Sequence, residues 1–369
     1  MSTAEQQTEI LIIGAGLCGL ALADHLRRVG REYLLIEARD RLGGRIERAE
    51  VGGAAYDLGP AWFWPGQPRM AALAKRFQIP VFEQFARGDL VFETQSGAVQ
   101  RGRGYASMEG SYRLDGGMGA LVDALASVLE EDRLWRNTHL EKVAHAPSGV
   151  KAHLVRDGEA VTLKANQIVL AIPPRVVADT IAFEPALDDQ QTRSLAAVPT
   201  WMAGQAKIVA VYDQPHWRKA GLSGDAMSQR GPMVEIHDAS PMSPPEGGPF
   251  GLFGFVGIAA DTRQAHRDEM MQLAQAQLVS IFGPEMAQPK HLVLQDWATL
   301  PEIARAMDKT PTGHHPSYGL PAHVTELAEH GIHFGSTETA RGFGGYLEGA
   351  LEAAENVAIR VTQKAAEKA

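Results

Sequence analysis

A six-residue turn near the N-terminus, Gly14-Ala-Gly-Leu-Cys-Gly19, limits most strongly what this chain can fold into. It follows a short apolar run, Ile10–Ile13, and precedes a helical segment that runs from 20 to 29 and ends at Gly30. An unbroken apolar run of this length is typical of a buried parallel strand. In a G-x-G-x-x-G turn, the first glycine permits a tight bend, the second lets the backbone approach a diphosphate, and the third lets helix and strand pack closely. The pattern predicts a βαβ unit that holds a dinucleotide.

The residues after this turn extend the expected site. The diphosphate would lie at the helix N-terminus, where free N–H groups and the helix dipole favour negative charge. Glu37 ends a second buried strand, 33–37, at the distance where an acid binds a ribose diol, and it disfavours a ribose with a 2′-phosphate. Gly43 and Gly44 allow a second backbone approach to the diphosphate, and Arg45 can neutralise it. The contacts expected here are Gly14, Ala15, Gly16, Leu17, Gly19, Glu37, Ala38, Arg39, Gly43, Gly44 and Arg45.

Length, charge and cysteine content narrow the class of protein. A chain of 369 residues with 45% hydrophobic residues favours two closely packed globular domains. The net charge of −9, without a block of Lys or Arg, argues against nucleic acid as a partner. Cys18 is the only cysteine, so no intramolecular disulfide can form, and we expect Cys18 to pack in the first helix of a cytoplasmic protein. Residues 1–9 are too polar for a signal peptide and 351–369 too polar to span a bilayer, so no membrane partner is expected.

Further elements follow from hydrophobic periodicity. Strands are expected at 151–156, 161–163, 168–171, 207–212, 233–236, 250–258 and 332–335, and helices at 268–282 and 349–364. Pro173-Pro174 ends the third of these strands, because proline cannot donate to a sheet. These elements predict an α/β fold in which a Rossmann-type domain is followed by a second, α+β domain.

Taken in order, these segments resemble the flavin-containing amine oxidase family, and monoamine oxidases in particular, over nearly the whole chain. Ile36–Arg45 is similar to the family's FAD ribose and diphosphate segment, and Tyr56–Trp62 to the segment that passes close to the flavin ring. Ala171–Pro174 resembles the strand end that leads into the substrate domain. The resemblance implies further FAD contacts at Gly59, Pro60, Ala61, Trp62, Leu140, Ala171 and Trp297. It also implies an FAD-binding domain of residues 1–65, 116–175 and 331–369, and a substrate domain of residues 66–115 and 176–330.

Two stretches carry the catalytic part of the resemblance. Lys207 lies in a strand ten residues before Trp217, where the family has a lysine that holds a water against flavin N5. Without the family, a lysine in a strand would indicate an edge or solvent-facing position. Residues 334–340 and 345–350 resemble the family's closing FAD motif, which implies contacts from Glu338 and Gly345.

The closing motif also implies two contacts at the flavin ring. Tyr346 would face the flavin as one wall of an aromatic cage, although by itself it could equally be a core aromatic before a helix. The backbone N–H of Leu347 would meet the pyrimidine carbonyl, where a positive helix end stabilises the reduced flavin anion.

The resemblance implies oxidation of a small primary or secondary amine. A hydride passes from the carbon next to nitrogen to the flavin, the imine hydrolyses, and dioxygen becomes hydrogen peroxide. Lys207 and Tyr346 are the expected catalytic residues, and a monomer or homodimer is expected. Alternatives are an amino acid oxidase, a polyamine oxidase or a desaturase of the same superfamily, a reductase, or a flavin-binding protein without catalysis.

Three departures from the family pattern modify this interpretation. The cysteine that would attach flavin covalently is missing, and Ala306 stands in its place, so non-covalent FAD is expected. The second cage position falls on Met307, with Phe343 and Tyr318 as alternatives. Residues 65–115 form a shorter segment than in the family, which predicts a reduced substrate domain and a more open cavity.

Two other groups of polar residues have simpler interpretations. His314-His315 has no second ligand pair at useful spacing, so no metal is expected. Arg101, Arg103 and Arg113 could bind a substrate carboxylate, but solvated surface positions are the default expectation.

Overall fold

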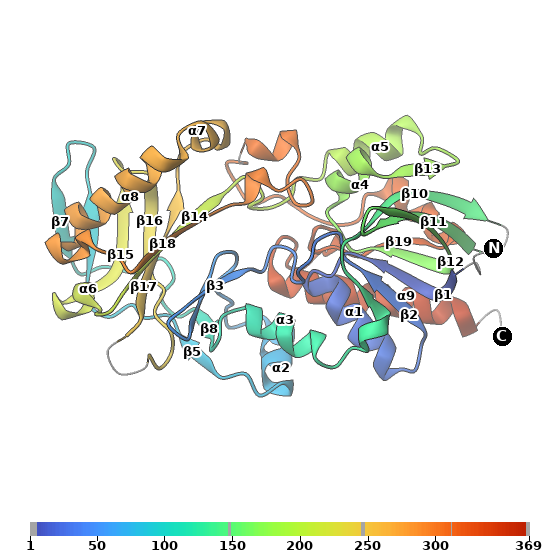
Figure 1. Cartoon of the computed structure of the whole chain (residues 1–369), viewed down its shortest axis with the longest axis horizontal. Coiled ribbons are helices and arrows are strands. Elements are labelled where there is room, and N and C mark those ends of the chain that lie inside the picture. The colour runs from blue at the N-terminus through green and yellow to red at the C-terminus, as the bar shows by residue number, and fades with distance from the viewer. Residues whose placement is uncertain (1–5, 147–148, 245–247, 311, 367–369) are drawn as a thin grey trace.

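The computed structural model describes residues 6–146, 149–244, 248–310 and 312–366, and it has two lobes, each built around one β-sheet (Figure 1). The first and the last described elements, β1 (Gln6–Ile13) and α9 (Leu347–Ala366), lie in the same lobe (Figure 1). Within these described residues, no helix is both long enough and apolar enough to cross a lipid bilayer.

The first sheet has β1 (Gln6–Ile13) near its centre, paired in parallel with β2 (Tyr33–Ile36) and β12 (Glu159–Leu170). The apolar run suits this position because both faces of the strand are buried. Ile10 and Ile12 join one hydrophobic cluster, and Leu11 and Ile13 join the cluster on the other face. The order is β13-β10-β11-β12-β1-β2-β9, with β19 paired to β12. The remaining strands are β9 (Leu134–Trp135), β10 (Thr138–Ala146), β11 (Gly149–Arg156), β13 (Ala182–Glu184) and β19 (Ile332–Phe334).

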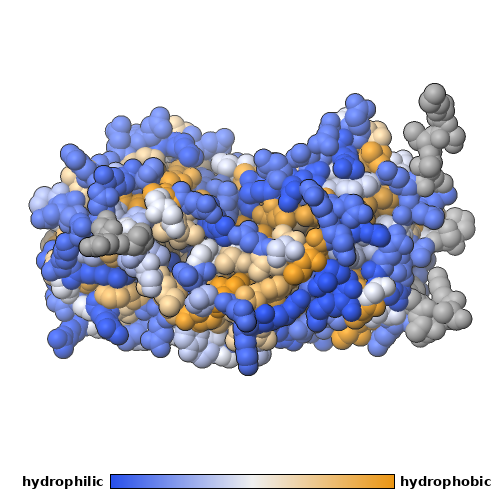
Figure 2. All heavy atoms as spheres, turned by 60° about the horizontal axis from the view of Figure 1, so that its bottom comes forward, coloured by the Kyte–Doolittle hydropathy of each residue, from blue (hydrophilic) through white to orange (hydrophobic). Residues whose placement is uncertain are grey.

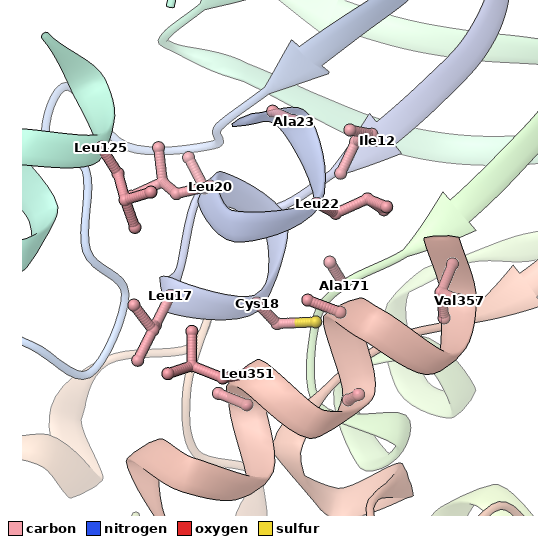
Figure 3. Close-up of a cluster of buried hydrophobic side chains, with 14 of the residues drawn as sticks. Ile12, Leu17, Cys18, Leu20, Leu22, Ala23, Leu125, Ala171, Leu351 and Val357 are labelled. Carbon is pink, nitrogen blue, oxygen red and sulfur yellow. The ribbon is translucent and has the colours of Figure 1, made fainter. Parts of the chain in front are cut away.

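Helices cover both faces of this sheet. On one face, α1 (Leu17–Arg28) packs against α9 (Leu347–Ala366), and Cys18 is buried between them as expected (Figure 3). Helices α2 (Pro68–Arg76) and α3 (Gly119–Ala126) add side chains to the same cluster. The other face is covered by α4 (Pro174–Thr180), α5 (Asp189–Ala196) and the 3-10 helix η5 (Ala322–His330). The Rossmann-type first domain is confirmed.

The second sheet has the order β18-β14-β17-β16-β15-β6-β7. Its strand β14 (Ala206–Tyr212) is buried on both faces. Ile208 and Ala210 face the cluster under α8 (Arg267–Phe282), so Lys207 and Val209 face the opposite side, toward the first lobe. The other elements are β6 (Asp89–Glu93), β7 (Val99–Gly102), β15 (Leu222–Ser228), β16 (Met233–Asp238), β17 (Phe250–Val256), β18 (His291–Asp296), α6 (His216–Lys219) and α7 (Ala260–Ala265).

Two small antiparallel two-stranded sheets lie between the lobes (Figure 1). They pair β3 (Arg48–Val51) with β4 (Ala54–Asp57), and β5 (Val81–Glu83) with β8 (Tyr112–Leu114). The segment that follows β4 packs Ala61 and Trp62 against Val209 and Phe253 of the second sheet.

Several boundaries differ from the sequence prediction, among them that of the first helix, which begins at Leu17 rather than at 20. The strands expected at 161–163 and 168–171 form one strand, β12, because the polar residues between them are accommodated: Lys164 and Asn166 are exposed, and Gln167 contacts residues of α9 and β19. Buried Gln167 donates to the carbonyl of Val361 and contacts His333 Nε2, at 2.9 Å each. The final helix begins at Leu347, two residues earlier than expected.

The expected domain limits can be refined from the packing. Residues 182–184 pair with β10, and α4, α5 and η5 cover the first sheet. We therefore propose that 176–196 and 322–330 belong to the first lobe rather than to the substrate domain. Residues 1–5 and 367–369 of the expected first domain lie outside the described residues.

Candidate active site and cofactor cavity

A cavity of about 800 Å³ extends from the glycine turn before α1 to Lys207 on β14. Figure 2 shows hydrophobic side chains gathered at the waist between the lobes. Ile13, Ile36 and Ala171, at or just beyond the carboxyl ends of β1, β2 and β12, line the cavity. Ligands of open α/β sheets bind at this edge.

The structure brings most of the predicted residues to this cavity. Those that line it are Gly14, Gly16, Leu17, Glu37, Ala38, Arg39, Gly43, Gly44, Arg45, Gly59, Pro60, Ala61, Trp62, Leu140, Ala171, Lys207, Trp297, Gly345, Tyr346 and Leu347. Ala15, Gly19 and Glu338 do not line it, and each instead contacts a residue that does.

The glycines of the turn have different surroundings. A Cβ added to Gly16 would meet no atom within 4 Å, so the backbone there borders open space. A Cβ added to Gly19 would lie 1.9 Å from the carbonyl oxygen of Gly14, so only glycine lets α1 pack on the turn. Gly14 itself has a φ of +99°, a conformation that favours glycine. Among the residues that the structure describes, no side-chain cap is found at the N-terminus of α1, which leaves its N–H groups available to an anion.

Backbone groups hold the Glu37 carboxylate. It accepts hydrogen bonds from the N–H of Ala15 at 2.9 Å and the N–H of Arg39 at 3.0 Å. Burial raises its pKa, and these hydrogen bonds oppose that effect. Within the described chain, two buried donors of cavity-lining residues, Arg39 Nη1 and Ser336 Oγ, have no hydrogen-bond partner. Because buried donors are normally paired, they indicate a ligand with acceptor oxygens.

Arg45 is anchored by Glu338. The guanidinium donates from Nη1 to Oε1 at 2.7 Å and from Nη2 to Oε2 at 3.1 Å. Burial would lower the pKa of Arg45, but the fully buried Glu338 carboxylate outweighs this and raises it. Arg45 therefore remains a fixed cation at the cavity wall.

Lys207 is buried at the opposite end of the cavity. Its Nζ donates to the carbonyl oxygens of Asp57 and Gly59, each at 2.9 Å, and lies 3.7 Å from the ring centroid of Phe253. Burial lowers its pKa to about 7, which the Asp57 carboxylate opposes and the Arg113 guanidinium reinforces. The amine is therefore near the balance between its charged and neutral forms at neutral pH.

Two aromatic side chains meet at this end. Tyr346 and Trp64 both line the cavity, with ring centroids 6.2 Å apart and planes at 84°. His315 stacks on Tyr346 with centroids 4.9 Å apart and planes at 16°, although it does not itself line the cavity. The described residues include no group of three or more His, Cys, Asp or Glu side chains able to hold a metal.

The prediction for Met307 is wrong. Met307 is 62% exposed and does not line the cavity. The two alternatives for this position, Phe343 and Tyr318, do not line it either. The physical reason is its neighbour Asp308, which is buried, pairs with Arg175 and accepts the N–H of Thr200. This anchor turns the short 3-10 helix η4 (Ala306–Lys309) so that Ala306 and Met307 face solvent.

Glu348 connects the starts of two helices. It lies in the first turn of α9, is fully buried, and accepts the N–H of Arg69 at 3.1 Å and of Met70 at 2.9 Å. Both N–H groups belong to the first turn of α2, so the carboxylate caps α2 from another helix. This contact ties the Tyr346 end of α9 to the segment that carries Trp64.

The three arginines considered for carboxylate binding lie away from the cavity. Arg101 and Arg103 are exposed, and Arg113 is buried against the carbonyls of Ala239 and Ser240. The surface interpretation therefore holds for Arg101 and Arg103 but not for Arg113.

Sequence reasoning missed several cavity residues, among them Trp64, Gln67, Trp201, Gln205 and Phe255. The sequence contained a signal that could have indicated Trp64 and Gln67. Pro68 is the first residue of α2, and proline at that position marks a helix start. Trp64 also lies two residues from Trp62, so both side chains point to one face of an extended segment.

The fold and the cavity together define a two-lobed protein with a Rossmann-type lobe and a cavity that reaches from its glycine turn to a buried lysine. The family model described as flavin containing amine oxidoreductase matches residues 87–362, and the model of the NAD(P)-binding Rossmann-like domain matches residues 12–77. The chain belongs to the flavin-containing amine oxidoreductase family and is an oxidoreductase with a flavin cofactor.

Individual proteins agree with this assignment. The chain is 26% identical to the protein of Mycobacterium tuberculosis named as flavin-containing monoamine oxidase AofH, over 96% of each chain. It is 22% identical to the putrescine oxidase of Kocuria rosea, over 68% of this chain and 73% of that protein. The structure of cyclohexylamine oxidase from Brevibacterium oxydans shares the fold, with a TM-score of 0.78 at 19% identity over 97% of this chain and 99% of the other.

Proposed function

We propose that this chain uses FAD to oxidise a small primary or secondary amine to an imine, with dioxygen as acceptor and hydrogen peroxide as product. The observation that carries this proposal is the buried Lys207 amine, which has a lowered pKa and lines the aromatic end of the dinucleotide cavity. When bound, the flavin accepts the hydride from the amine carbon. The nitrogen loses a proton in the same oxidation, and dioxygen takes up the two electrons with two protons.

The cavity residues fit FAD in an extended form. Gly16 offers an open backbone approach, Arg45 a fixed cation, and Arg39 and Ser336 unpaired donors, all suited to a diphosphate. Glu37 would bind the adenosine ribose. The flavin ring would then be contacted by Gly59 to Trp62, Trp297 and the start of α9.

We propose non-covalent attachment of this FAD. The sole thiol, Cys18, is buried in α1, where burial raises its pKa and keeps it protonated. Ala306 is exposed and does not line the cavity. Acid precipitation should release all yellow colour into the supernatant, and flavin that stays in the pellet would contradict this attachment.

Lys207 has the geometry to act on a water or on the substrate amine. In its neutral form, the two N–H bonds are taken up by the Asp57 and Gly59 carbonyls, so the lone pair is the remaining direction of the nitrogen. Such an amine can hold a water near the flavin and exchange a proton with it. Tyr346 would orient the substrate with its ring face, and the N–H of Leu347 would meet the pyrimidine carbonyl.

Anaerobic titration of the yellow holoprotein with a panel of amines, amino acids and NADPH tests the proposal. Bleaching by amines, followed by peroxide release when air is admitted, is the expected result. Bleaching by NADPH alone would indicate a reductase, and no bleaching by any compound would indicate a flavin-binding protein without this activity. Preferential bleaching by amino acids would contradict the proposed substrate class.

A further inference from the structure

We propose that a second cavity, between η5 and the elements β19 and α9 of the first lobe, is a binding site for a small monocarboxylate with an apolar body (Figure 1). Among the described residues, none lines both this cavity and the proposed cofactor cavity. The site is therefore separate from the place of amine oxidation, and this inference goes beyond the proposed function without depending on it.

The second cavity has a volume of about 310 Å³, a size that suits a small ligand. Glu352, Asn356 and Arg360 line it from α9, and their spacing of four residues places them on one face of that helix. Val324 and Ala328 line it from η5. The cavity is thus polar along α9 and mostly apolar along η5.

The third lining element, β19, is an edge strand, since among the described strands it pairs only with β12. Gly331 accepts a hydrogen bond from β12 at 2.8 Å, and Gly335 donates one to it at 3.0 Å. Because alternate residues of a parallel strand bond to the same neighbour, Ile332 and Phe334 turn their N–H and C=O groups toward the open edge. The Phe334 carbonyl agrees with this orientation, because it accepts Nη2 of Arg360 at 3.3 Å.

This open edge leaves the N–H groups of Ile332 and Phe334 without a partner strand in the described part of the chain. Both residues line the cavity, and they are only 6% and 1% exposed. Buried backbone donors are nearly always paired with the chain, with ordered water or with a ligand. The edge therefore receives an acceptor from outside the chain.

Arg341 and Arg360 indicate that this acceptor is an anion. Both line the cavity, and neither guanidinium forms an ion pair with a carboxylate of the described chain. Burial lowers the pKa of Arg360, as expected for a cation that lacks a carboxylate partner. A carboxylate accepts two parallel hydrogen bonds from one guanidinium, which makes it a suitable ligand for such a pair.

Glu352 limits the charge of the ligand. It is the one carboxylate among the described lining residues, and its Oε1 accepts the N–H groups of Arg341 and of the next residue at 3.0 and 3.2 Å. Arg341, Arg360 and Glu352 together carry a net charge of +1, which suits a monoanion better than a phosphate with two negative charges. The apolar lining from Val324 and Phe334 favours an anion with a hydrocarbon body, so an alkyl or aryl carboxylate meets both conditions.

Calorimetric titration of the yellow holoprotein with sodium 3-phenylpropanoate tests this site. We expect saturable binding, with a Kd at least about tenfold higher in Arg360→Met, as the loss of a charged hydrogen bond would give. Arg267→Met removes the same charge from the exposed start of α8 in the other lobe and should keep the wild-type Kd. Lys207→Met, altered in the cofactor cavity, should also keep it. The neutral 3-phenylpropanamide and inorganic phosphate should each bind at least about tenfold more weakly than the acid.

Hydrogen exchange of the backbone amides gives a second readout, located at the site itself. Bound 3-phenylpropanoate should slow exchange at Ile332 and Phe334 in the wild type but not in Arg360→Met at the same concentration. The inference would be overturned by an absence of saturable binding, by a wild-type Kd in Arg360→Met, or by an equal loss of affinity in Arg267→Met or Lys207→Met. Equal or tighter binding of the amide or of phosphate, or unchanged exchange at both amides, would also overturn it. Because binding is measured without turnover, failure of every amine to bleach the flavin would refute the proposed function alone.

Discussion

Replacing Lys207 with methionine tests whether this amine is as desolvated as the structure indicates. Burial lowers the pKa of Lys207 from its ordinary value of 10.5 to about 7. In the unfolded chain the amine stays protonated up to its ordinary pKa of 10.5. In the folded protein it is neutral above its lowered pKa of about 7. Folding therefore releases a proton between them, and the stability of the wild type must rise with pH across this window.

The magnitude follows from the linkage of proton release to stability. Each pH unit within the window changes the free energy of unfolding by about 1.4 kcal/mol per proton released. Between about pH 7.5 and about pH 9.5 the wild type should therefore gain about 2.5 kcal/mol over Lys207→Met, which cannot titrate at this position. Asp57 and Arg113, the charged groups that act on Lys207, are present in both proteins, so their own contributions largely cancel.

Urea unfolding of both proteins at the two pH values measures this difference. The variant also loses the hydrogen bonds to the Asp57 and Gly59 carbonyls, but this loss affects the measurements at both pH values equally. The test therefore compares the difference in unfolding free energy between wild type and variant at one pH with the same difference at the other. A difference that stays constant with pH would refute the reasoning, since it would mean that the lysine titrates normally in the folded protein.

Three further outcomes are expected. Lys207→Met should retain FAD but slow turnover or flavin reoxidation by about a hundredfold in stopped-flow measurements, the size of a typical proton-transfer contribution; unchanged kinetics would remove this residue from the mechanism. Gly16→Ala should lower FAD affinity and leave the melting temperature of the apoprotein unchanged, whereas Gly19→Ala should lower both, because only the second Cβ meets the chain itself. Glu338→Ala should destabilise the protein by about 3 to 5 kcal/mol in denaturant unfolding, because it leaves the Arg45 cation without its buried partner; a stability equal to wild type would show that water replaces the carboxylate.

The elements predicted best from the sequence are those set by local patterns. The glycine turn and the apolar strand before it specify their own conformation, because bond geometry and periodicity act over a few residues. The burial of Lys207 did not follow from a local pattern, which by itself indicates an edge or solvent-facing lysine; β14 is buried on both faces because packing between the two lobes covers it.

The residues that the sequence placed wrongly, or did not reveal, depend on contacts between distant segments. Met307 faces solvent because Asp308 binds Arg175 and Thr200, more than a hundred residues earlier in the chain. The resemblance named Glu338, but its pairing with Arg45 could not be foreseen, because no spacing rule connects residues that are 293 positions apart. The role of Trp64 depends on how the turn before α2 meets α9, which only tertiary packing decides.

The last part of the chain has a consequence for how the protein is made. Strand β19 completes the sheet beside β12, and α9 closes the cluster over α1, so the first lobe needs residues from both ends of the chain (Figure 3). During synthesis, the glycine turn emerges early but has no α9 to pack against until translation is nearly finished. Nascent chains should therefore be unable to take up flavin, and a ribosome stalled before residue 332 should carry a colourless protein.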